Sequence, residues 1–90
     1  MAAPRFEVGR LVATPGALAA LIPEEPLTLL SRHVSGDWGD VPPEDAVENE
    51  FSVERGFRVV SSYHTAVGTR VWVITEADRS STCILLPEEY

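Results

Sequence analysis

The run from Phe57 to Leu86, FRVVSSYHTAVGTRVWVITEADRSSTCILL, decides the fold class of this chain. It contains three stretches in which β-branched and aromatic residues are frequent, as is typical of strands. Two short segments containing Gly, Asp or Ser separate the stretches and predict tight turns. We therefore expect a three-stranded antiparallel meander with strands at 57–65, 69–76 and 81–86.

The N-terminal part predicts one further strand and a short helix. Residues 5–14 place Phe6, Val8 and Val12 on alternate positions, which predicts a strand with a candidate bulge at Gly9. Thr14 precedes a proline, and this pair is typical of the start of a helix. The helix-forming run that follows ends at Pro23, so this helix has one or two turns.

Two longer helices are predicted in the middle of the chain. The first begins near Pro26 and ends at Gly36. The second begins at Pro43 or Glu44 and ends at Gly56, and its apolar stripe contains Val47 and Phe51. We expect a single α+β domain over residues 1–90, with an about four-stranded, mostly antiparallel sheet and two to three short helices on one face.

Length and composition exclude several classes of protein. Ninety residues are too few for a Rossmann methyltransferase or a P-loop NTPase. The single Cys83 excludes an internal disulfide and a multi-thiolate zinc site. We assign no metal and no cofactor. The N-terminus lacks the pattern of a signal peptide, and no apolar stretch reaches the length of a membrane span. We therefore expect a cytoplasmic protein that does not contact a membrane.

The charge is strongly negative and unevenly distributed. Fourteen acidic residues and seven arginines give a net charge of −7, which argues against direct binding to nucleic acid. Half of the acids lie between Asp37 and Glu54, where no basic residue occurs. Such a run is typical of a solvated surface, and it also suits a basic protein partner. The candidate interaction residues are Asp37, Trp38, Asp40, Glu44, Asp45, Glu48 and Glu54.

The densest polar cluster is SRHVSGDWGD at residues 31–40. His33 with Asp37 or Asp40 has the residue types of a base with its orienting group, or of metal ligands. The structural interpretation, which we favour, is that Asp37 bonds the amides of the glycine turn and His33 caps the helix. No nucleophile motif or complete metal motif accompanies the cluster, so we assign no catalytic residue.

A second polar cluster lies at the predicted turn between the last two strands. There, Glu76, Asp78 and Arg79 favour a local salt bridge with turn bonding. If this turn closed on the first cluster, the two together would form a ligand site. The candidate ligand residues are then Arg32, His33, Glu76, Asp78 and Arg79, with Asp37 and Asp40 beside them.

Both clusters also carry a resemblance to a known family. The segments LSRHVSGDWGD (30–40), WVITEADRSST (72–82) and LLPEEY (85–90) resemble small bacterial proteins encoded on plasmids, prophages and other mobile elements. These proteins are often labelled hypothetical, plasmid-related or type I restriction endonuclease subunit M. The similarity runs from about Phe6 to the end of the chain, and it carries no assigned catalytic residues.

The methyltransferase label does not fit this sequence. The chain has no Gly-x-Gly cofactor loop and no Asn/Asp-Pro-Pro-aromatic segment. What the resemblance does imply is an accessory protein that binds a nucleic-acid enzyme, as anti-restriction and anti-CRISPR proteins do.

Three hypotheses follow for the function. The first is a non-enzymatic acidic interaction protein of a mobile element, which modulates or inhibits a nucleic-acid-processing or defence enzyme. A homodimer is compatible with this hypothesis. The alternative is a small hydrolase or a ligand- or metal-binding protein that uses the two polar clusters. A third is a dimerisation module, which requires the sheet to expose an apolar patch from Val59, Val71, Val73 and Ile84.

Overall fold

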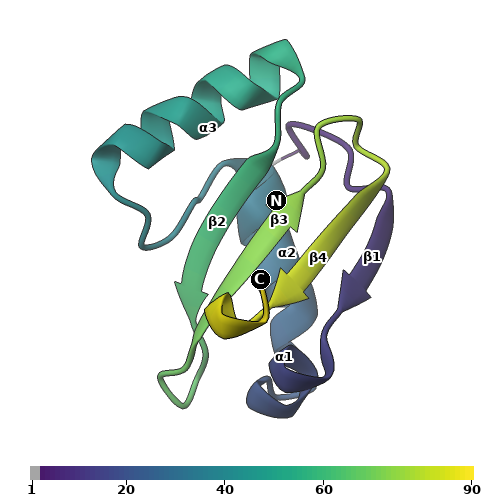
Figure 1. Cartoon of the computed structure of the whole chain (residues 1–90), viewed down its shortest axis with the longest axis vertical. Helices are drawn as coiled ribbons and strands as arrows, with labels where there is room; N and C mark the ends of the chain where they lie inside the picture. Colours follow the sequence, from purple (N-terminus) through teal and green to yellow (C-terminus); the bar gives the residue numbers. More distant parts are fainter. Residues whose placement is uncertain (1–2) are drawn as a thin grey trace.

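The computed structural model describes residues 3–90 and contains one mixed four-stranded sheet with helices beside it (Figure 1). The elements are β1 (Arg10–Ala13), α1 (Pro15–Ala20), α2 (Glu25–Ser35), α3 (Pro43–Arg55), β2 (Val59–His64), β3 (Arg70–Thr75), β4 (Ser81–Leu85) and the 3-10 helix η1 (Pro87–Glu89). The strand order is β1-β4-β3-β2, with β1 parallel to β4 and the other pairs antiparallel. The predicted α+β class and the C-terminal meander are confirmed.

One face of the sheet, called here the covered face, packs against α1 and α2. Its core contains Tyr63, Val71, Val73 and Ile84 from the strands together with Ala17 of α1 and Leu29 of α2. Figure 1 shows α2 behind the sheet. Alternate strand residues point to the other side, called here the groove face, which carries Val60, Ser62, Arg70, Trp72 and Ile74.

The helix boundaries follow the predicted capping residues. The Thr14 hydroxyl accepts a hydrogen bond from the Ala17 N–H at 3.2 Å and so caps α1. Gly36 and Gly56 end α2 and α3 with φ of 91° and 77°, a left-handed conformation that glycine adopts without steric cost. Within the described residues, no helix has both the length and the apolar character that crossing a bilayer requires.

The first strand is shorter than predicted. Strand pairing begins only at Arg10, because Gly9 has φ of 63° and lies against the β3–β4 turn. A Cβ at Gly9 would come within 2.3 Å of the Ser80 carbonyl oxygen. Phe6 therefore does not belong to a strand; its ring packs edge-on to His33, with the ring centroids 5.2 Å apart.

The predicted apolar stripe of α3 does not face the core. Val47 and Phe51 are 70% and 44% exposed, whereas Asn49 and Ser52 are buried. The reason is the position of the helix: α3 lies along the β2 edge of the sheet (Figure 1), where backbone groups need polar partners. Periodicity identified the helix correctly but assigned its inner face wrongly.

The apolar patch required by a sheet-face dimerisation module is absent from the described surface. Val59, Val71, Val73 and Ile84 are at most 1% exposed, since all four belong to the covered face. The condition set for a dimerisation module is therefore not met at these residues, and the sequence could not decide it, because alternation along a strand distinguishes two faces but does not identify the one the helices cover.

Candidate functional site

The polar cluster at residues 31–40 forms the end of α2 and the loop that follows it. The N–H groups of Gly36 and Asp37 bond to carbonyls in the last turn of the helix. The Asp37 carboxylate accepts from Arg32 Nε at 2.7 Å and from the Gly39 N–H at 3.2 Å. The hydrogen bond from Arg32 lowers the pKa of Asp37. Asp37 thus stabilises its own loop, in the way the structural interpretation describes.

His33 is fully buried between α2 and the sheet, within a chain of hydroxyl groups. Its Nδ1 lies 2.6 Å from Ser61 Oγ, and its Nε2 lies 2.9 Å from Thr75 Oγ1. Thr75 in turn lies 2.7 Å from Thr82 Oγ1, which donates to the Val8 carbonyl at 2.9 Å. The prediction that His33 caps the end of its helix is therefore wrong. His33 instead crosslinks α2 to β2 and β3.

The direction of this chain fixes the tautomer of the imidazole. Because the Thr82 hydroxyl hydrogen goes to Val8, Thr82 accepts from Thr75, and Thr75 must accept from His33 Nε2–H. Nδ1 is then left to accept from the Ser61 hydroxyl. The only lone pair of the ring is used inside the core, so His33 has no free nitrogen with which to act as a base or to bind a metal.

Burial keeps this histidine neutral. Desolvation, aided by the positive charge of Arg79, lowers the pKa of His33 to about 4. The same desolvation raises the pKa of the Tyr63 phenol to about 12, and that hydroxyl donates to the Asp37 carbonyl at 2.6 Å. Both groups consequently keep one protonation state through the neutral range and serve the packing between α2 and the sheet.

Arg79 connects the β3–β4 turn to the rest of the molecule. Its guanidinium donates to the carbonyls of Phe57, Glu76 and Ser52, the last at 3.0 Å, near the end of α3. It also lies over the Phe6 ring, 5.4 Å from the centroid. The predicted salt bridge within this turn is wrong, because Arg79 bonds to carbonyl oxygens at a helix C-terminus, where a cation is favoured.

The acids of the turn are used locally or lie in solvent. The Asp78 carboxylate accepts from the Ser80 N–H at 3.0 Å, and hydrogen bonding to Ser80 lowers the pKa of Asp78. Glu76 is exposed. Asp37 and the buried His33 form their hydrogen bonds within the fold, and Arg79 donates to backbone carbonyls, while His33 and Arg79 both pack against the Phe6 ring.

Trp38 is a buried anchor of the loop. Only 6% of its surface is exposed, and its ring stacks on Phe6 with the centroids 6.2 Å apart. The indole N–H donates to Glu50 of α3 at 3.0 Å, and Glu50 also forms an ion pair with Arg5. Of the predicted interaction residues, Trp38 is therefore not available to a partner without local unfolding.

The loop then covers part of the β2 edge. The Ser62 N–H donates to the Trp38 carbonyl at 3.0 Å, and the Asp40 N–H donates to the Ser62 carbonyl at 2.7 Å. The Asp40 carboxylate pairs with His64 Nδ1 at 2.6 Å. Asn49 of α3 completes the cover, because its side-chain amide bonds both the N–H and the carbonyl of Val60, at 3.1 and 2.7 Å.

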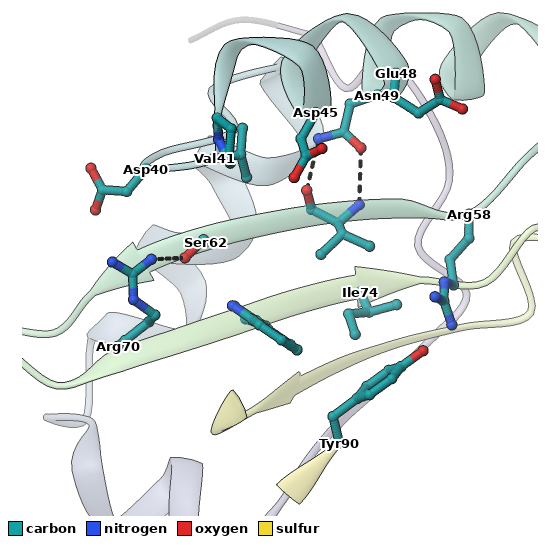
Figure 2. Close-up of a pocket in the computed structure, with 13 residues that line it drawn as sticks. Asp40, Val41, Asp45, Glu48, Asn49, Arg58, Ser62, Arg70, Ile74 and Tyr90 are labelled. Carbon is teal, nitrogen blue, oxygen red and sulfur yellow. Dashed lines mark hydrogen bonds between the residues drawn. The ribbon is translucent and has the colours of Figure 1, made fainter. Parts of the chain in front are cut away.

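A groove of about 700 Å³ lies between α3 and the groove face (Figure 2). We call it the α3 groove. Its α3 side and the preceding loop carry three of the predicted interaction residues, and its floor is formed by β2 and β3. The lining residues are Asp40, Val41, Pro42, Asp45, Glu48, Asn49, Arg58, Val60, Ser62, Arg70, Trp72, Ile74 and Tyr90.

The floor and ends of the groove are organised by aromatic and arginine side chains. Trp72 and Tyr90 meet edge to face with centroids 5.8 Å apart, and Arg58 lies over the Tyr90 ring at 5.5 Å. At the other end of the groove, Arg70 donates to the Ser62 hydroxyl at 2.7 Å. Both arginines therefore contact neutral groups and form no ion pair among the described residues, and neither do Asp45 and Glu48 on the α3 side, whereas Asp40 is paired with His64.

The remaining predicted interaction residues are exposed. Within residues 3–90, no arginine or histidine lies within ion-pair distance of Glu44, Asp45, Glu48 or Glu54. Asp45 and Glu48 line the α3 groove, whereas Glu44 and Glu54 do not. The acidic run therefore faces more than one direction, and only part of it borders a concave surface.

Sequence reasoning missed the groove floor. The alternation of Arg70, Trp72 and Ile74 was a visible signal, because it places one charged and two apolar side chains on a single face of β3. Nothing local showed that the helices leave this face partly open. Asn49 was also missed, since an amide within a helix is usually a solvent-facing residue.

In the part of the chain that the structure describes, no three His, Cys, Asp or Glu side chains are grouped so that they could hold a metal ion. No family model, curated protein or solved structure matches the chain.

Proposed function

We propose that this chain is a non-enzymatic module that binds a basic segment of a partner protein in the α3 groove. The observation that carries the proposal is the meeting of two features in one concavity. The acidic residues Asp40, Asp45 and Glu48 line the same groove as the apolar side chains of Trp72 and Ile74, together with Arg58 and Arg70 near its ends. A segment with Lys or Arg beside apolar side chains complements both features.

Unpaired charge favours such a partner over a neutral one. Asp45 and Glu48 form no ion pair with the described residues, and the whole chain has a net charge of −7. Approach of a basic segment relieves repulsion among these carboxylates and accelerates association. The floor then supplies apolar contact, with Trp72 as the largest side chain, of the aromatic type that dominates binding energy at interfaces.

The class of partner follows from its charge. Surfaces that normally hold DNA or RNA are rich in Lys and Arg, and an acidic protein can occupy them in place of the nucleic acid. The resemblance to proteins of mobile elements also supports a nucleic-acid-processing or defence enzyme as the partner. Binding there would modulate or inhibit that enzyme without any catalytic step by this chain.

The test uses a fluorescent peptide of alternating Lys and Val, compared with one of alternating Glu and Val, and measures binding by fluorescence anisotropy. The wild type is expected to bind the Lys-Val peptide and not the Glu-Val peptide. The double variant Asp45→Lys, Glu48→Lys should lose at least about tenfold in affinity, since it places like charges in contact. Trp72→Ser should also weaken binding.

The matched control is Glu7→Lys, Glu24→Lys, which makes the same change in net charge at exposed positions outside the groove lining. At physiological ionic strength this control should lose less than about threefold, because charges beyond a Debye length are screened. If both double variants lost the same affinity for the Lys-Val peptide, net charge alone would explain the binding. The proposal that the peptide binds in the α3 groove would then be overturned. A Lys-Val peptide that binds no better than the Glu-Val peptide would overturn it as well.

A further inference from the structure

The two edges of the sheet are treated differently by the rest of the chain. The β2 edge is covered by the 38–40 segment and by Asn49, which together bond the outward backbone groups of Val60 and Ser62. The β1 edge forms the opposite border of the sheet (Figure 1), where Leu11 and Val12 are 39% and 41% exposed. An uncovered edge strand is a template for pairing with another strand.

The hydrogen-bond pattern between β1 and β4 shows which backbone groups of β1 are free. Arg10 N–H donates to the Ser80 carbonyl at 2.9 Å, and Thr14 N–H donates to the Ile84 carbonyl at 3.0 Å. Because alternate residues of a strand face one neighbour, Leu11 and Ala13 direct their N–H and carbonyl groups away from β4. This edge therefore offers two donors and two acceptors in a row.

The charge around β1 favours a second copy of this chain as the occupant. Between Val8 and Pro23 the only charged residue is Arg10, and the Glu89 carboxylate, which lies at the end of β1, accepts hydrogen bonds from the Thr14 hydroxyl and the Gly16 N–H. Because the chain as a whole has a net charge of −7, two copies repel each other least where acids are few. Pairing at β1 also keeps the two acidic α3 helices apart, because α3 lies along the other edge of each sheet.

We infer that two copies of this chain pair antiparallel through β1 and form one continuous eight-stranded sheet. The free groups dictate the register. Leu11 must exchange both backbone hydrogen bonds with Ala13 of the other copy, so Val12 faces Val12 across the twofold axis. Arg10 then lies opposite Thr14 and not opposite another arginine.

The same edges explain why such an assembly stops at two copies. Gly9, with φ of 63°, ends the strand on one side, and Pro15 begins α1 on the other. Each copy then presents only its β2 edge, which Asn49 and the 38–40 segment already cover. A sheet with one open edge closes as a dimer, whereas one with two open edges extends into a fibre. A 90-residue domain, whose core is small, also gains from the added burial.

The first test measures molar mass by light scattering over a dilution series. The wild type is expected at about twice its 9.8 kDa chain mass. Val12→Lys should halve that mass, because it places two like charges directly opposite each other. Val67→Lys is the matched control, since Val67 is an exposed valine in the β2–β3 turn and should leave the dimer intact. A monomeric wild type, or a Val12→Lys variant that stays dimeric, would overturn the inference.

A second test checks the register and is independent of stability. In a Cys83→Ala background, Val12→Cys should form a disulfide between copies on mild oxidation, because facing residues of a non-hydrogen-bonded pair lie about 4.5 Å apart at Cα. Leu11→Cys in the same background faces Ala13 of the other copy and should stay reduced. If Val12→Cys and Leu11→Cys crosslinked equally well, or if neither crosslinked, the two copies would not pair in this register. Either result would contradict the proposed interface. Since β4 separates β1 from the groove floor on β2 and β3, peptide binding by Val12→Lys should fall by less than about threefold at physiological ionic strength.

Discussion

The polar groups beside the two faces of the sheet are used in opposite ways. On the covered face, His33, Ser61, Thr75 and Thr82 satisfy one another in a chain that ends on a backbone carbonyl. On the groove face, the carboxylates of Asp45 and Glu48 have no ionic partner among the described residues. Buried polar groups that are all paired stabilise a fold, whereas exposed charges beside apolar surface are free to meet a partner.

Removing the histidine should have the largest effect and would test whether the covered face is structural. His33→Leu leaves the Ser61 hydroxyl without a partner and removes one of the two hydrogen bonds of the Thr75 hydroxyl, which still bonds Thr82. The unsatisfied Ser61 group costs about 1–3 kcal/mol and the lost bond to Thr75 about 1 kcal/mol, so we expect a loss of roughly 3 kcal/mol in the free energy of unfolding. Urea denaturation measures it. His33→Gln, which can donate and accept, should retain a larger share of the stability than Leu does, and the opposite ranking would contradict the network.

The pH dependence of stability should reflect the same residue. In the unfolded chain His33 has a pKa of 6.5, and in the fold burial lowers it to about 4. The folded state therefore binds this proton less readily, so its contribution is complete above pH 6.5 and is lost as the pH falls toward 4. The loss amounts to about 3 kcal/mol.

Denaturation of wild type and His33→Gln between pH 4 and 7, roughly the range in which histidine titrates, isolates this contribution. The Gln variant should show a flatter pH profile than the wild type. If the Gln variant kept the wild-type slope, burial of His33 would not be its cause.

The hydrogen bonds that attach α3 to the sheet should contribute less to the free energy of unfolding than the hydrogen bonds of His33. Asn49→Ala removes the two hydrogen bonds to Val60 and leaves the backbone N–H and carbonyl of Val60 without partners. We expect a loss of about 2 kcal/mol. Hydrogen exchange should show faster exchange at the Val60 amide, with the amide of Val73 on β3 unchanged. A protected Val60 amide in the variant would mean that another group caps this edge.

A matched pair of truncations on neighbouring β3 residues contrasts the two faces directly. Val73→Ala, in the core of the covered face, should cost about 2 kcal/mol through the cavity that it leaves. Trp72→Ala on the groove face should cost about 1 kcal/mol, chiefly the lost contact with Tyr90, although it deletes a much larger side chain. If the tryptophan truncation were the more destabilising one, the groove floor would be part of the core.

The smallest effect on stability is expected on the rim of the groove. Glu48 is exposed and forms no ion pair with the described residues, so Glu48→Lys should change the free energy of unfolding by less than about 0.5 kcal/mol. Thermal denaturation checks this. A strongly destabilised variant would show that Glu48 serves the fold and is not reserved for a partner.

Local patterns in the sequence were enough for the secondary structure and much of the topology. Strand-forming runs separated by turn residues placed the meander, and capping residues such as Thr14 and Gly36 located the helix ends. The prediction that Asp37 bonds the amides of its own loop is also confirmed. These features depend on contacts between residues close in the chain, so a single sequence contains the information.

The positions of side chains relative to distant elements could not be read in this way. His33 was expected to cap a helix and Trp38 to be presented to a partner, and the stripe of Val47 and Phe51 was identified without the element against which α3 packs. Each outcome depends on which element packs beside it. The helix α3 lies at a sheet edge, where the buried position requires an amide such as Asn49 and not an apolar stripe.

The sequence by itself determined the α+β class, the meander, the helix ends and the excess of negative charge, because these follow from backbone preferences and composition. Only the tertiary structure decided which face of the sheet is covered, which edge is closed and that three of the acidic residues line the same groove as Trp72. The physical reason is that strand alternation and helix periodicity define two sides of each element. Long-range packing alone selects the side that becomes buried.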